Sequence, residues 1–338
     1  MPANTRKIGR TNVEVSALGI GGAPFGGNFS EGDRSDAVAV VRAGFDAGLN
    51  FVDTAPFYGF GRSERAVGDA IRGRDYILST KVGRLLAPGS DPDPMLGGMR
   101  NPLPFNPVYD YTYDGVMRSY EDSLQRLGLD RIDILLAHDI GKFQHGEEDN
   151  KRYFADLESG GYKALDELRS SGQVGAIGLG VNENAICLDV LKIGDWDTFL
   201  LAGRYTLLEQ TPLDDLIPAC LASGTTLIIG GPFNAGVMLG GELWNYAKAP
   251  PQVLDRVRKI HAICADHNVD PAVAALQFPL AHPVVSSVIP GAKNETEFRG
   301  ILNWAAQPTP RALWSDLQSA GLIHADAPLP DGSPILAA

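Results

Sequence analysis

Apolar and polar positions divide the chain into two kinds of segment that alternate from one end to the other. Short continuous apolar runs are typical of strands covered on both faces, as parallel strands are, and longer segments carry apolar residues at helical spacing. The predicted strands are Val15–Ile20, Asn50–Asp53, Tyr76–Lys81, Ile132–Ala137, Val174–Gly180, Thr198–Leu201, Thr225–Ile229 and Val285–Ile289. This alternation predicts an α/β fold, a single (β/α)8 TIM barrel domain spanning residues 1–338.

Helical patterns fill the intervals between these strands. They cover Ser35–Ala47 with a Ser cap, Ser63–Arg72, Gly115–Leu127, Tyr162–Ser171, Asn184–Lys192, Leu213–Ser223, Gln252–His267, Pro271–Ala281, Asn294–Ala306 and Pro310–Ser319. Before the first strand, a turn at Arg10–Asn12 predicts a hairpin that closes the barrel floor. Residues 320–338 are rich in Pro and Ala, and we expect a mobile tail.

One long segment, residues 83–113, interrupts the alternation. It is dense in Gly, Pro and aromatic residues, and its many prolines exclude a helix. It follows the strand that ends at Lys81, so we expect a long loop on the face where the strands end. Such a loop is more often a substrate lid than a structural insertion. In a lid, Phe105, Tyr109 and Tyr111 would stack on the ring of a substrate.

Ionisable side chains stand where three successive predicted strands end. Asp53 ends one strand and is followed by Tyr58, Lys81 ends the next, and His138 ends the third. Each alone has an ordinary structural explanation, such as a helix cap, a packed ring, a solvated end or a hydrogen-bonded imidazole. Because all strand ends of a parallel barrel open onto one face, the sequence predicts that the four side chains converge on a proton-transfer site.

Composition and charge restrict the classes of molecule that we expect as partners. The chain has 41 acidic and 29 basic residues and a net charge of −12, so we expect a small-molecule substrate and neither nucleic acid nor a membrane as partner. Cys187, Cys220 and Cys264 lie in helix-like apolar stretches and are expected to be buried, reduced thiols in a cytoplasmic protein. The histidines lack metal-ligand spacing, so no metal is expected. The oligomeric state is left open.

Two glycine motifs suggest contact with a nucleotide. The run Gly19–Gly22 resembles the start of a dinucleotide fingerprint, but it lacks the third glycine and the helix that should follow. These glycines are better explained by close approach of the backbone to a bound ring. The segment Gly230–Gly236 ends the seventh predicted strand, where barrels often bind phosphate through backbone N–H groups; the alternative is a tight turn.

Three segments resemble the aldo-keto reductase family. They are DTAPFYGFGRSE (Asp53–Glu64), GRTNVEVSALGIGG (Gly9–Gly22) and IPGAKN (Ile289–Asn294), and the similarity spans nearly the whole chain. The resemblance implies a (β/α)8 barrel, a nicotinamide cofactor and hydride transfer at a carbonyl carbon. By position, the family's catalytic tetrad corresponds to Asp53, Tyr58, Lys81 and His138.

The resemblance assigns a role to each of the four. Tyr58 would be the acid/base, and the Lys81 ammonium would lower its pKa from the usual value near ~10. Asp53 would keep Lys81 charged and oriented, and His138 would bind the substrate oxygen and relay the proton.

The resemblance also implies cofactor contacts after several strands. They involve Gly21, Gly22, Asn182, Gly231, Phe233, Asn234, Gly236, Pro290, Gly291, Lys293 and Glu297. Two family positions are altered: Ala202 replaces the usual carboxamide-binding Gln, and Gly230 replaces a tyrosine that often stacks on nicotinamide.

The choice between NAD and NADP rests on Glu297. Many NADP-dependent relatives carry a basic residue at this position, seven residues after Pro290. A carboxylate there would repel a 2′-phosphate and could accept hydrogen bonds from a free ribose, so NAD is the preferred cofactor. NADP remains possible because Lys293 could contact a phosphate. The alternative is that Glu297 is a solvated residue at a helix N-terminus, where acids are favoured anyway.

Within the family, the segments Ala137–Gly141, GLGVNE and Ala202–Gln210 resemble bacterial aldose 1-dehydrogenases of the L-fucose or D-threo-aldose type, and also pyridoxal 4-dehydrogenase. Both activities oxidise a cyclic hemiacetal to a lactone. Our first interpretation is the sugar, with pyridoxal as the alternative. A non-catalytic nucleotide-binding subunit is a third interpretation, since fold alone does not fix function.

Overall fold

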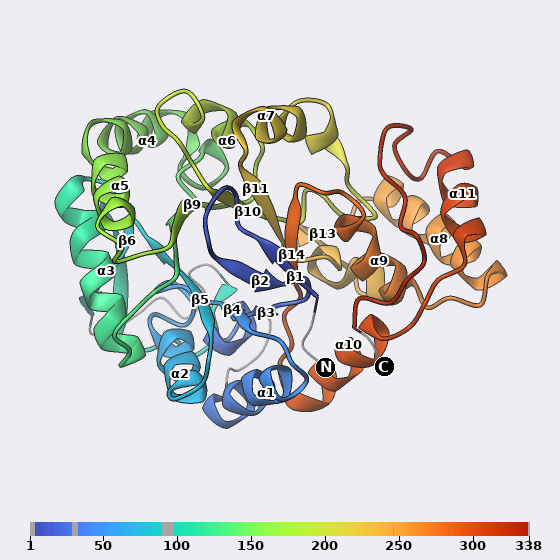
Figure 1. The fold of residues 1–338 in the computed structure, drawn as a ribbon, viewed down its shortest axis with the longest axis horizontal. Coiled ribbons are helices and arrows are strands. Elements are labelled where there is room, and N and C mark those ends of the chain that lie inside the picture. Colours follow the sequence, from blue (N-terminus) through green and yellow to red (C-terminus); the bar gives the residue numbers. More distant parts are fainter. Residues whose placement is uncertain (1–3, 29–32, 90–97, 246, 337–338) are drawn as a thin grey trace.

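Eight parallel strands form one sheet in the order β14-β11-β10-β9-β8-β5-β4-β3 (Figure 1). In chain order they are β3 (Ile20–Gly21), β4 (Phe51–Asp53), β5 (Ile77–Val82), β8 (Ile134–His138), β9 (Ala176–Val181), β10 (Thr198–Ala202), β11 (Thr226–Gly230) and β14 (Val285–Ile289). Parallel bridges Leu18–Val288 and Gly21–Gly291 join the two edges. The sheet therefore closes into the predicted (β/α)8 barrel.

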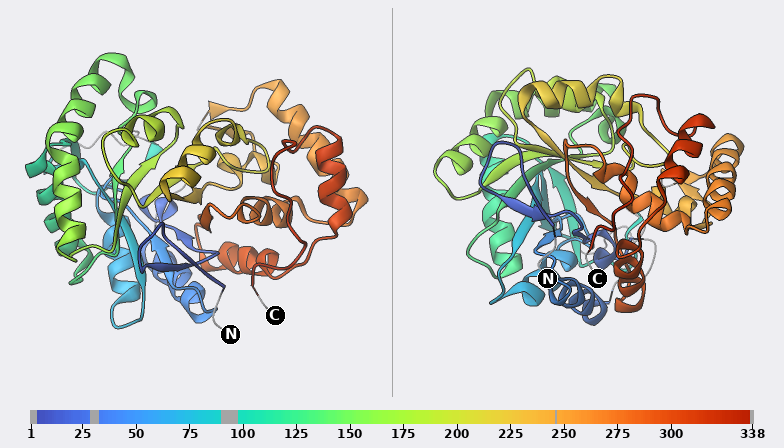
Figure 2. Two further views of the ribbon diagram at one scale, coloured as in Figure 1. Left: turned by 45° about the horizontal axis from the view of Figure 1, so that its top comes forward. Right: turned by 45° about the vertical axis from the view of Figure 1, so that its right-hand side comes forward.

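This computed structural model describes residues 4–28, 33–89, 98–245 and 247–336. Ten helices agree with the predicted ones to within a few residues at each end. They are α1 (Arg34–Asp46), α2 (Arg62–Ile71), α3 (Tyr113–Leu127), α5 (Tyr162–Ser170), α6 (Ala185–Val190), α7 (Leu216–Ser223), α8 (Pro251–Asp266), α9 (Pro271–Leu280), α10 (Glu295–Ala305) and α11 (Arg311–Ser319). The helices surround the barrel, and α8 and α11 lie side by side on the outside of the molecule (Figures 1 and 2).

The first predicted strand, Val15–Ile20, is divided in the structure. Its start belongs to β2 (Glu14–Ser16), which pairs antiparallel with β1 (Thr5–Lys7) in the predicted hairpin, and only its last residue enters the barrel. The apolar run continues through both elements, so the pattern could not separate them. Ile8 and Val15 of the hairpin pack with Phe51 and Leu136 inside the barrel and close its floor.

Segment 83–113 is a hairpin and not an irregular loop. Its strands β6 (Arg84–Pro88) and β7 (Phe105–Tyr109) pair antiparallel, with residues 90–97 outside the described part. We call these two strands the lid hairpin. Its first residue, Arg84, is 2% exposed and stacks on Phe57, close to the end of β4. The hairpin therefore lies on the face where the strands end, as expected.

Two local expectations were wrong, and one helix was missed. The cap of α1 is Asp33, whose side chain accepts from the backbone N–H groups of Ser35 and Asp36. Helix α4 (Lys142–Asp156) was not predicted, because Asn150 is its one buried residue and it has no apolar stripe. Residues 320–336 are packed and not a mobile tail: Leu322 and Leu336 are buried, and the backbone N–H of Leu336 donates to Ala305.

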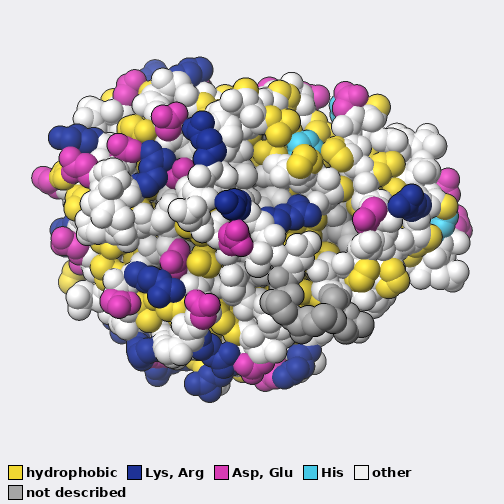
Figure 3. Space-filling view, in the orientation of Figure 1, with side chains coloured by type: hydrophobic (Ala, Val, Ile, Leu, Met, Phe, Trp, Pro, Cys, Tyr) yellow, Lys and Arg dark blue, Asp and Glu magenta, His cyan; other side chains and the backbone are white. Residues whose placement is uncertain are grey.

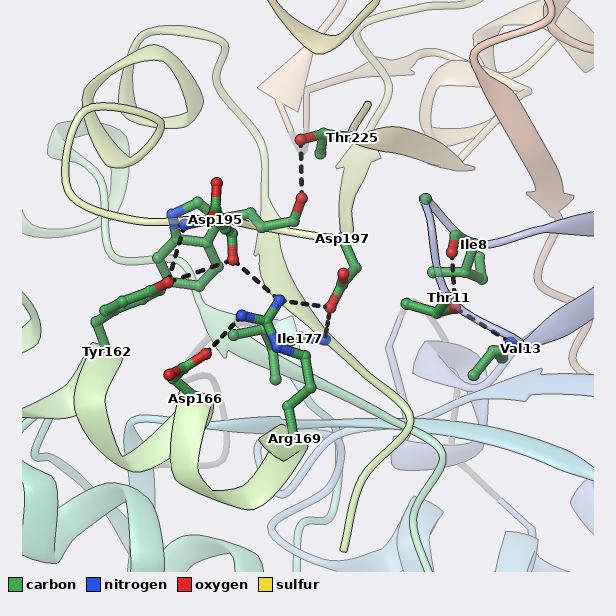
Figure 4. Close-up of polar contacts among 12 residues, drawn as sticks. Ile8, Thr11, Val13, Tyr162, Asp166, Arg169, Ile177, Asp195, Asp197 and Thr225 are labelled. Atoms are coloured by element: carbon green, nitrogen blue, oxygen red, sulfur yellow. Dashed lines mark hydrogen bonds and ion pairs between the residues drawn. The ribbon is translucent and has the colours of Figure 1, made fainter. Parts of the chain in front are cut away.

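The opposite end of the barrel is held by a charged network (Figure 4). Arg169 on α5 pairs with Asp166 at 2.5 Å and with Asp197 at 3.0 Å, and Asp197 also accepts from the backbone N–H of Ile177 at 2.9 Å. This network lies where β9 and β10 begin. At this end of a barrel, side chains contribute to stability and not to catalysis.

Candidate active site

The ends of β4, β5 and β8 are neighbours in the sheet, in the order β8-β5-β4. Asp53 is the last residue of β4 and His138 the last of β8, while Lys81 lies one residue before the end of β5. Parallel pairing aligns Lys81 with Leu136 and Asp53 with Ser79. Three of the four predicted catalytic side chains are thus brought together by register alone.

Lys81 and Asp53 form a buried ion pair. The Lys81 Nζ lies 2.5 Å from Asp53 Oδ1, and the two side chains are 1% and 3% exposed. Lys81 also donates to the Thr54 carbonyl at 2.8 Å. Burial raises the pKa of the Asp53 carboxyl, and the Lys81 charge and the Ser79 hydroxyl oppose that rise. Removing either partner would leave an uncompensated charge in the core.

Tyr58 lies in the turn after β4 and is half-buried. Its ring centroid is 5.5 Å from the Lys81 Nζ and 5.9 Å from the His138 ring, which meets it edge-on. The turn is held by a bond from the Ser63 N–H to the Tyr58 carbonyl at 3.1 Å. A phenol, an ammonium and an imidazole therefore share one site. Lys81 therefore places its positive charge close to the ring of Tyr58.

His138 is 5% exposed, and its surroundings favour the neutral imidazole. Burial lowers the pKa of His138 well below its usual value, and the charges of Arg84 and Lys81 lower it further. The Tyr111 hydroxyl donates to the His138 carbonyl at 2.6 Å and fixes the end of the strand. Tyr111 is fully buried by this contact, so our expectation that it stacks on a substrate was wrong.

Two charged residues that the sequence interpretation missed adjoin His138. Arg84 Nη2 lies 2.6 Å from Asp139 Oδ2, and its guanidinium lies 4.3 Å from the centroid of Phe57. Asp139 in turn lies 3.5 Å from His138 Nε2. Only their place in the sequence could have indicated these residues, because Arg84 follows Lys81 by three residues and Asp139 directly follows His138.

Four of the proposed cofactor residues lie together beside Asp53. The N–H of Gly21 donates to the Pro290 carbonyl at 3.0 Å, and the N–H of Gly22 donates to the Asp53 carbonyl at 2.8 Å. A side chain at Gly22 would collide with that carbonyl, and one at Gly21 would lie 2.9 Å from the Ile289 carbonyl. Glycine is thus required at these two positions because the strand ends pack closely together. Gly291 pairs with Gly21 and is exposed.

In the segment after β11, the side chains of Phe233 and Asn234 contact other residues of the protein. A ligand would therefore meet the backbone of this segment more than its side chains. Asn234 is 3% exposed, accepts from Thr206 Oγ1 at 2.8 Å and donates to the Gly203 carbonyl at 3.1 Å. Phe233 packs on Trp304 at 6.0 Å. Gly231 (φ 58°) and Gly236 (φ 96°) are left-handed, and a Cβ on Gly236 would meet nothing within 4 Å. A ligand can approach the chain closely at these glycines.

A second polar network lies close to Ala202, one of the two altered family positions. Arg204, two residues after Ala202, donates from Nε to the Asn182 carbonyl at 2.6 Å and pairs with Glu209 at 3.0 Å. Glu209 also accepts from Trp244 Nε1 at 2.8 Å. The Asn182 side chain donates to Asp139 at 3.1 Å. Asn182 therefore connects this network to the residues around His138.

Lys293 and Glu297 lie where α10 begins. The Glu297 carboxylate accepts from the backbone N–H of Lys293 at 2.9 Å, and the Glu297 N–H donates to Asn294 at 2.9 Å. Both side chains are exposed. This is the helix-terminus arrangement that we gave as the alternative for Glu297. It leaves the other carboxylate oxygen for further contacts.

These features fit a nicotinamide dinucleotide. A helix N-terminus and left-handed glycines are groups that bind phosphates. Backbone hydrogen bonds join the Pro290 segment to β3 and β3 to Asp53. Residues Gly231, Gly236, Gly291 and Lys293 would hold the dinucleotide, with Gly21 and Gly22 closest to the ion pair.

Further observations bear on the other expectations. All three cysteines are buried and free. Within the described ranges, no group of three or more His, Cys, Asp or Glu residues could hold a metal ion. No helix among the described residues is long and apolar enough to cross a membrane. On the face shown in Figure 3, acidic and basic side chains lie interspersed.

Comparisons with known proteins agree with this geometry. Residues 17–321 match the model of the Aldo/keto reductase family. The chain is 42% identical to pyridoxal 4-dehydrogenase of Microbacterium luteolum, over 94% of this chain and 97% of that protein. It is 34% identical to D-threo-aldose 1-dehydrogenase of a Pseudomonas species, over 92% and 95%. The holo structure of the aldo-keto reductase AKR11C1 from Bacillus halodurans has the same fold, with a TM-score of 0.75, 23% identity and coverage of 96% and 98%.

Proposed function

The chain belongs to the aldo/keto reductase family and is an NAD(P)-dependent oxidoreductase, and on this premise we propose that it oxidises the hydroxyl of a cyclic hemiacetal to a lactone. The substrate that we propose is pyridoxal, which was the alternative in our interpretation of the sequence. The observation that carries this choice is the 42% identity to a pyridoxal 4-dehydrogenase over 97% of its length, against 34% for the aldose enzyme.

The aromatic character of the site supports a flat substrate. Phe57 and Tyr58 both meet His138 edge-on, and Tyr109 lies 5.5 Å from the Arg84 guanidinium. Of these rings, Tyr58 and Tyr109 are partly exposed and suit a pyridine ring, which offers two flat faces for stacking. A pyranose remains the second candidate, because its apolar face also stacks on aromatic side chains.

The proposed chemistry moves one proton and one hydride. Tyr58, as the phenolate, takes the proton of the hemiacetal hydroxyl. When bound, NAD(P)⁺ would supply the hydride acceptor for the carbon that carries this hydroxyl. Lys81 stabilises the phenolate, Asp53 keeps Lys81 charged and in place, and His138 binds the reacting oxygen through an N–H. The products are the lactone and the reduced cofactor, with the released proton held on Tyr58.

We propose NAD as the preferred cofactor. The exposed Glu297 carboxylate is the support, because a negative charge beside the adenosine ribose opposes a 2′-phosphate. Lys293 is also exposed at the same helix end and keeps NADP as the second candidate.

The substrate is tested by initial rates of NADH formation with pyridoxal, L-fucose, D-arabinose and L-galactose under one set of conditions. The proposal predicts the highest kcat/KM for pyridoxal, with a lactone as the isolated product. A clear preference for one of the sugars would instead establish the aldose interpretation. Binding of NAD without turnover of any of the four would favour the non-catalytic interpretation.

A further inference from the structure

A groove lined by arginines lies beside α2 on the outside of the barrel. Helices α1 and α3 both pack against α2. The groove has a volume of about 780 Å³, which is in the usual range for sites that bind small molecules. No proposed catalytic or cofactor residue lines it, so it is separate from the site described above. Its basic residues are Arg34, Arg62, Arg65, Arg72 and Arg126.

The groove is positive on a chain whose net charge is −12. Among the described residues, Asp69 is the one acidic residue that lines the groove, against five arginines. Arg126 also pairs with the buried carboxylate of Glu64, which brings the net charge of this group of residues to +3. A concave surface with charges of one sign concentrates ions of the opposite sign. The groove should therefore attract anions, although the protein as a whole is acidic.

One carboxylate holds two of the arginines in place. Asp69 pairs through Oδ2 with Arg34, and its Oδ1 lies 3.2 Å from Arg72 Nη1. The side chains of Arg34 and Arg72 nevertheless remain 68% and 54% exposed. Because a guanidinium has five N–H donors, both side chains keep donors for a further anion.

Arg65 is the cation in the groove that most clearly needs a partner. Its side chain is exposed and forms no ion pair or hydrogen bond within the described ranges. Arg65 and Arg62 both lie among the first four residues of α2. The N-terminus of a helix carries a partial positive charge, so cations are unfavourable there. A bound anion would offset this repulsion.

The cations of the groove are all arginines, which indicates the class of ligand. The planar guanidinium binds two oxygens of a phosphate at once, whereas a lysine ammonium acts as a point charge. One phosphate group carries a charge of about −1.5 to −2, so two linked phosphates match the charge of the groove. We propose that the groove between α2 and α3 binds a small molecule that carries two linked phosphate groups.

The test is isothermal titration calorimetry of the full-length protein with inorganic pyrophosphate as the probe. The protein is first saturated with NAD, because pyrophosphate could otherwise enter the cofactor site. The wild type should bind one pyrophosphate per chain in a saturable manner. The affinity should fall as NaCl is added, because salt screens exposed charges.

A pair of matched variants locates the site. Arg65→Gln should raise the Kd for pyrophosphate about tenfold, the effect of losing one hydrogen bond from a charged group. The control is Arg10→Gln, because Arg10 lies in the turn between β1 and β2, is exposed, and forms no ion pair in the part of the chain that the structure describes. The control removes the same charge away from the groove and should leave the Kd unchanged. Both substitutions are at exposed side chains, so both variants should fold, which thermal unfolding checks.

Three results would overturn the proposal. The first is a wild-type protein with NAD bound that shows no saturable binding of pyrophosphate, including the case in which NAD abolishes binding seen without it. The second is an unchanged Kd in Arg65→Gln. The third is an equal rise of the Kd in Arg65→Gln and Arg10→Gln, which would mean that only the overall charge matters. The titrations involve no turnover, so their outcome is independent of the substrate test of the proposed function.

Discussion

Buried charges occupy the active site in opposed pairs. Lys81 with Asp53 and Arg84 with Asp139 are both formed at strand ends, and both positive partners are at most 2% exposed. Such pairs add little net stability compared with apolar residues, but losing one partner is costly. We infer that they are retained for the charge that they place beside Tyr58 and His138.

The Lys81–Asp53 pair gives a prediction for stability. Lys81→Met should lower the free energy of unfolding by about 3–5 kcal/mol, because it leaves Asp53 unpaired in the core. Without Lys81 the pKa of Asp53 lies still further above its unfolded value. The protonated form is tolerated, so the loss should be larger at pH 8 than at pH 5. Urea unfolding at both pH values measures it, and the matched control, Asp53→Asn with Lys81→Met, should recover much of the loss at pH 8. Equal losses at the two pH values would argue against an unpaired Asp53 as the cause.

Glu297 gives a prediction for the cofactor. Glu297→Arg should shift the ratio of kcat/KM for NADP over NAD toward NADP, because a cation replaces a carboxylate where a 2′-phosphate would lie. Glu297→Gln keeps an acceptor for the Lys293 N–H and removes only the charge, so it separates electrostatics from the helix-end contact. A strong wild-type preference for NADP, or an unaltered ratio in the Arg variant, would refute the role of Glu297.

The residues that we propose as catalytic stand out in the sequence because a strand end is visible as the last apolar residue of a run. Asp53, Lys81 and His138 all follow such runs. Arg84 and Asp139 could not be predicted in the same way. Nothing in a Gly- and Pro-rich segment indicates that Arg84 is buried, and the left-handed backbone of Asp139 arises from contacts with β9 that only the folded chain makes.

At the scale of elements, the lid hairpin contacts the chain next to His138, at the end of β8. Arg84 at its first position pairs with Asp139, and Tyr109 at its last packs edge-on against His145 at 4.8 Å. Sequence predicted the place of this segment but not its pairing, because its prolines obscured the strand pattern. Helix α4 was missed for a different reason, since most of its residues are polar and Asn150 is the one that is buried.

Shortening the hairpin separates its two contributions. Replacing residues 86–107 by a short Gly-Ser turn, with Arg84 and Tyr109 retained, should raise the KM for substrate much more than the KM for NAD. The kcat should change much less than the KM for substrate, because the Arg84–Asp139 pair remains. Initial-rate kinetics with both substrates varied gives all three values. An unchanged substrate KM and unchanged substrate preference would mean that the hairpin is only structural.

For the whole molecule, the barrel separates a catalytic end from a stabilising end. The approximate positions of the eight strands were predictable because continuous apolar runs identify them, whereas closure includes two isolated bridges at Leu18 and Gly21 that leave no mark in the sequence. In the Arg169 network at the opposite end, the contacts of Arg169 with Asp195 and Asp197 are long-range, and only the contact with Asp166 is local (Figure 4).

Because the two ends of the barrel are separate, a substitution in the Arg169 network should change stability without changing the kinetic constants. Arg169→Met should lower the free energy of unfolding by about 2 kcal/mol through loss of its hydrogen bonds to charged groups. The kcat and both KM values should stay within error of the wild type, because the network lies at the end of the barrel away from the site. Thermal unfolding and initial rates on one preparation test both parts. A marked loss of kcat in a folded variant would show that the two ends are coupled.

The central claim is that Tyr58 accepts the proton of the substrate hydroxyl. It is tested by the rate of pyridoxal oxidation in wild type and Tyr58→Phe, with NAD affinity measured on the same samples. The ring and its packing on His138 are kept, and only the proton site is removed. The account predicts a fall in kcat of about 10²–10⁴-fold with NAD affinity unchanged. A Phe variant that oxidises substrate at a rate close to the wild type would contradict it.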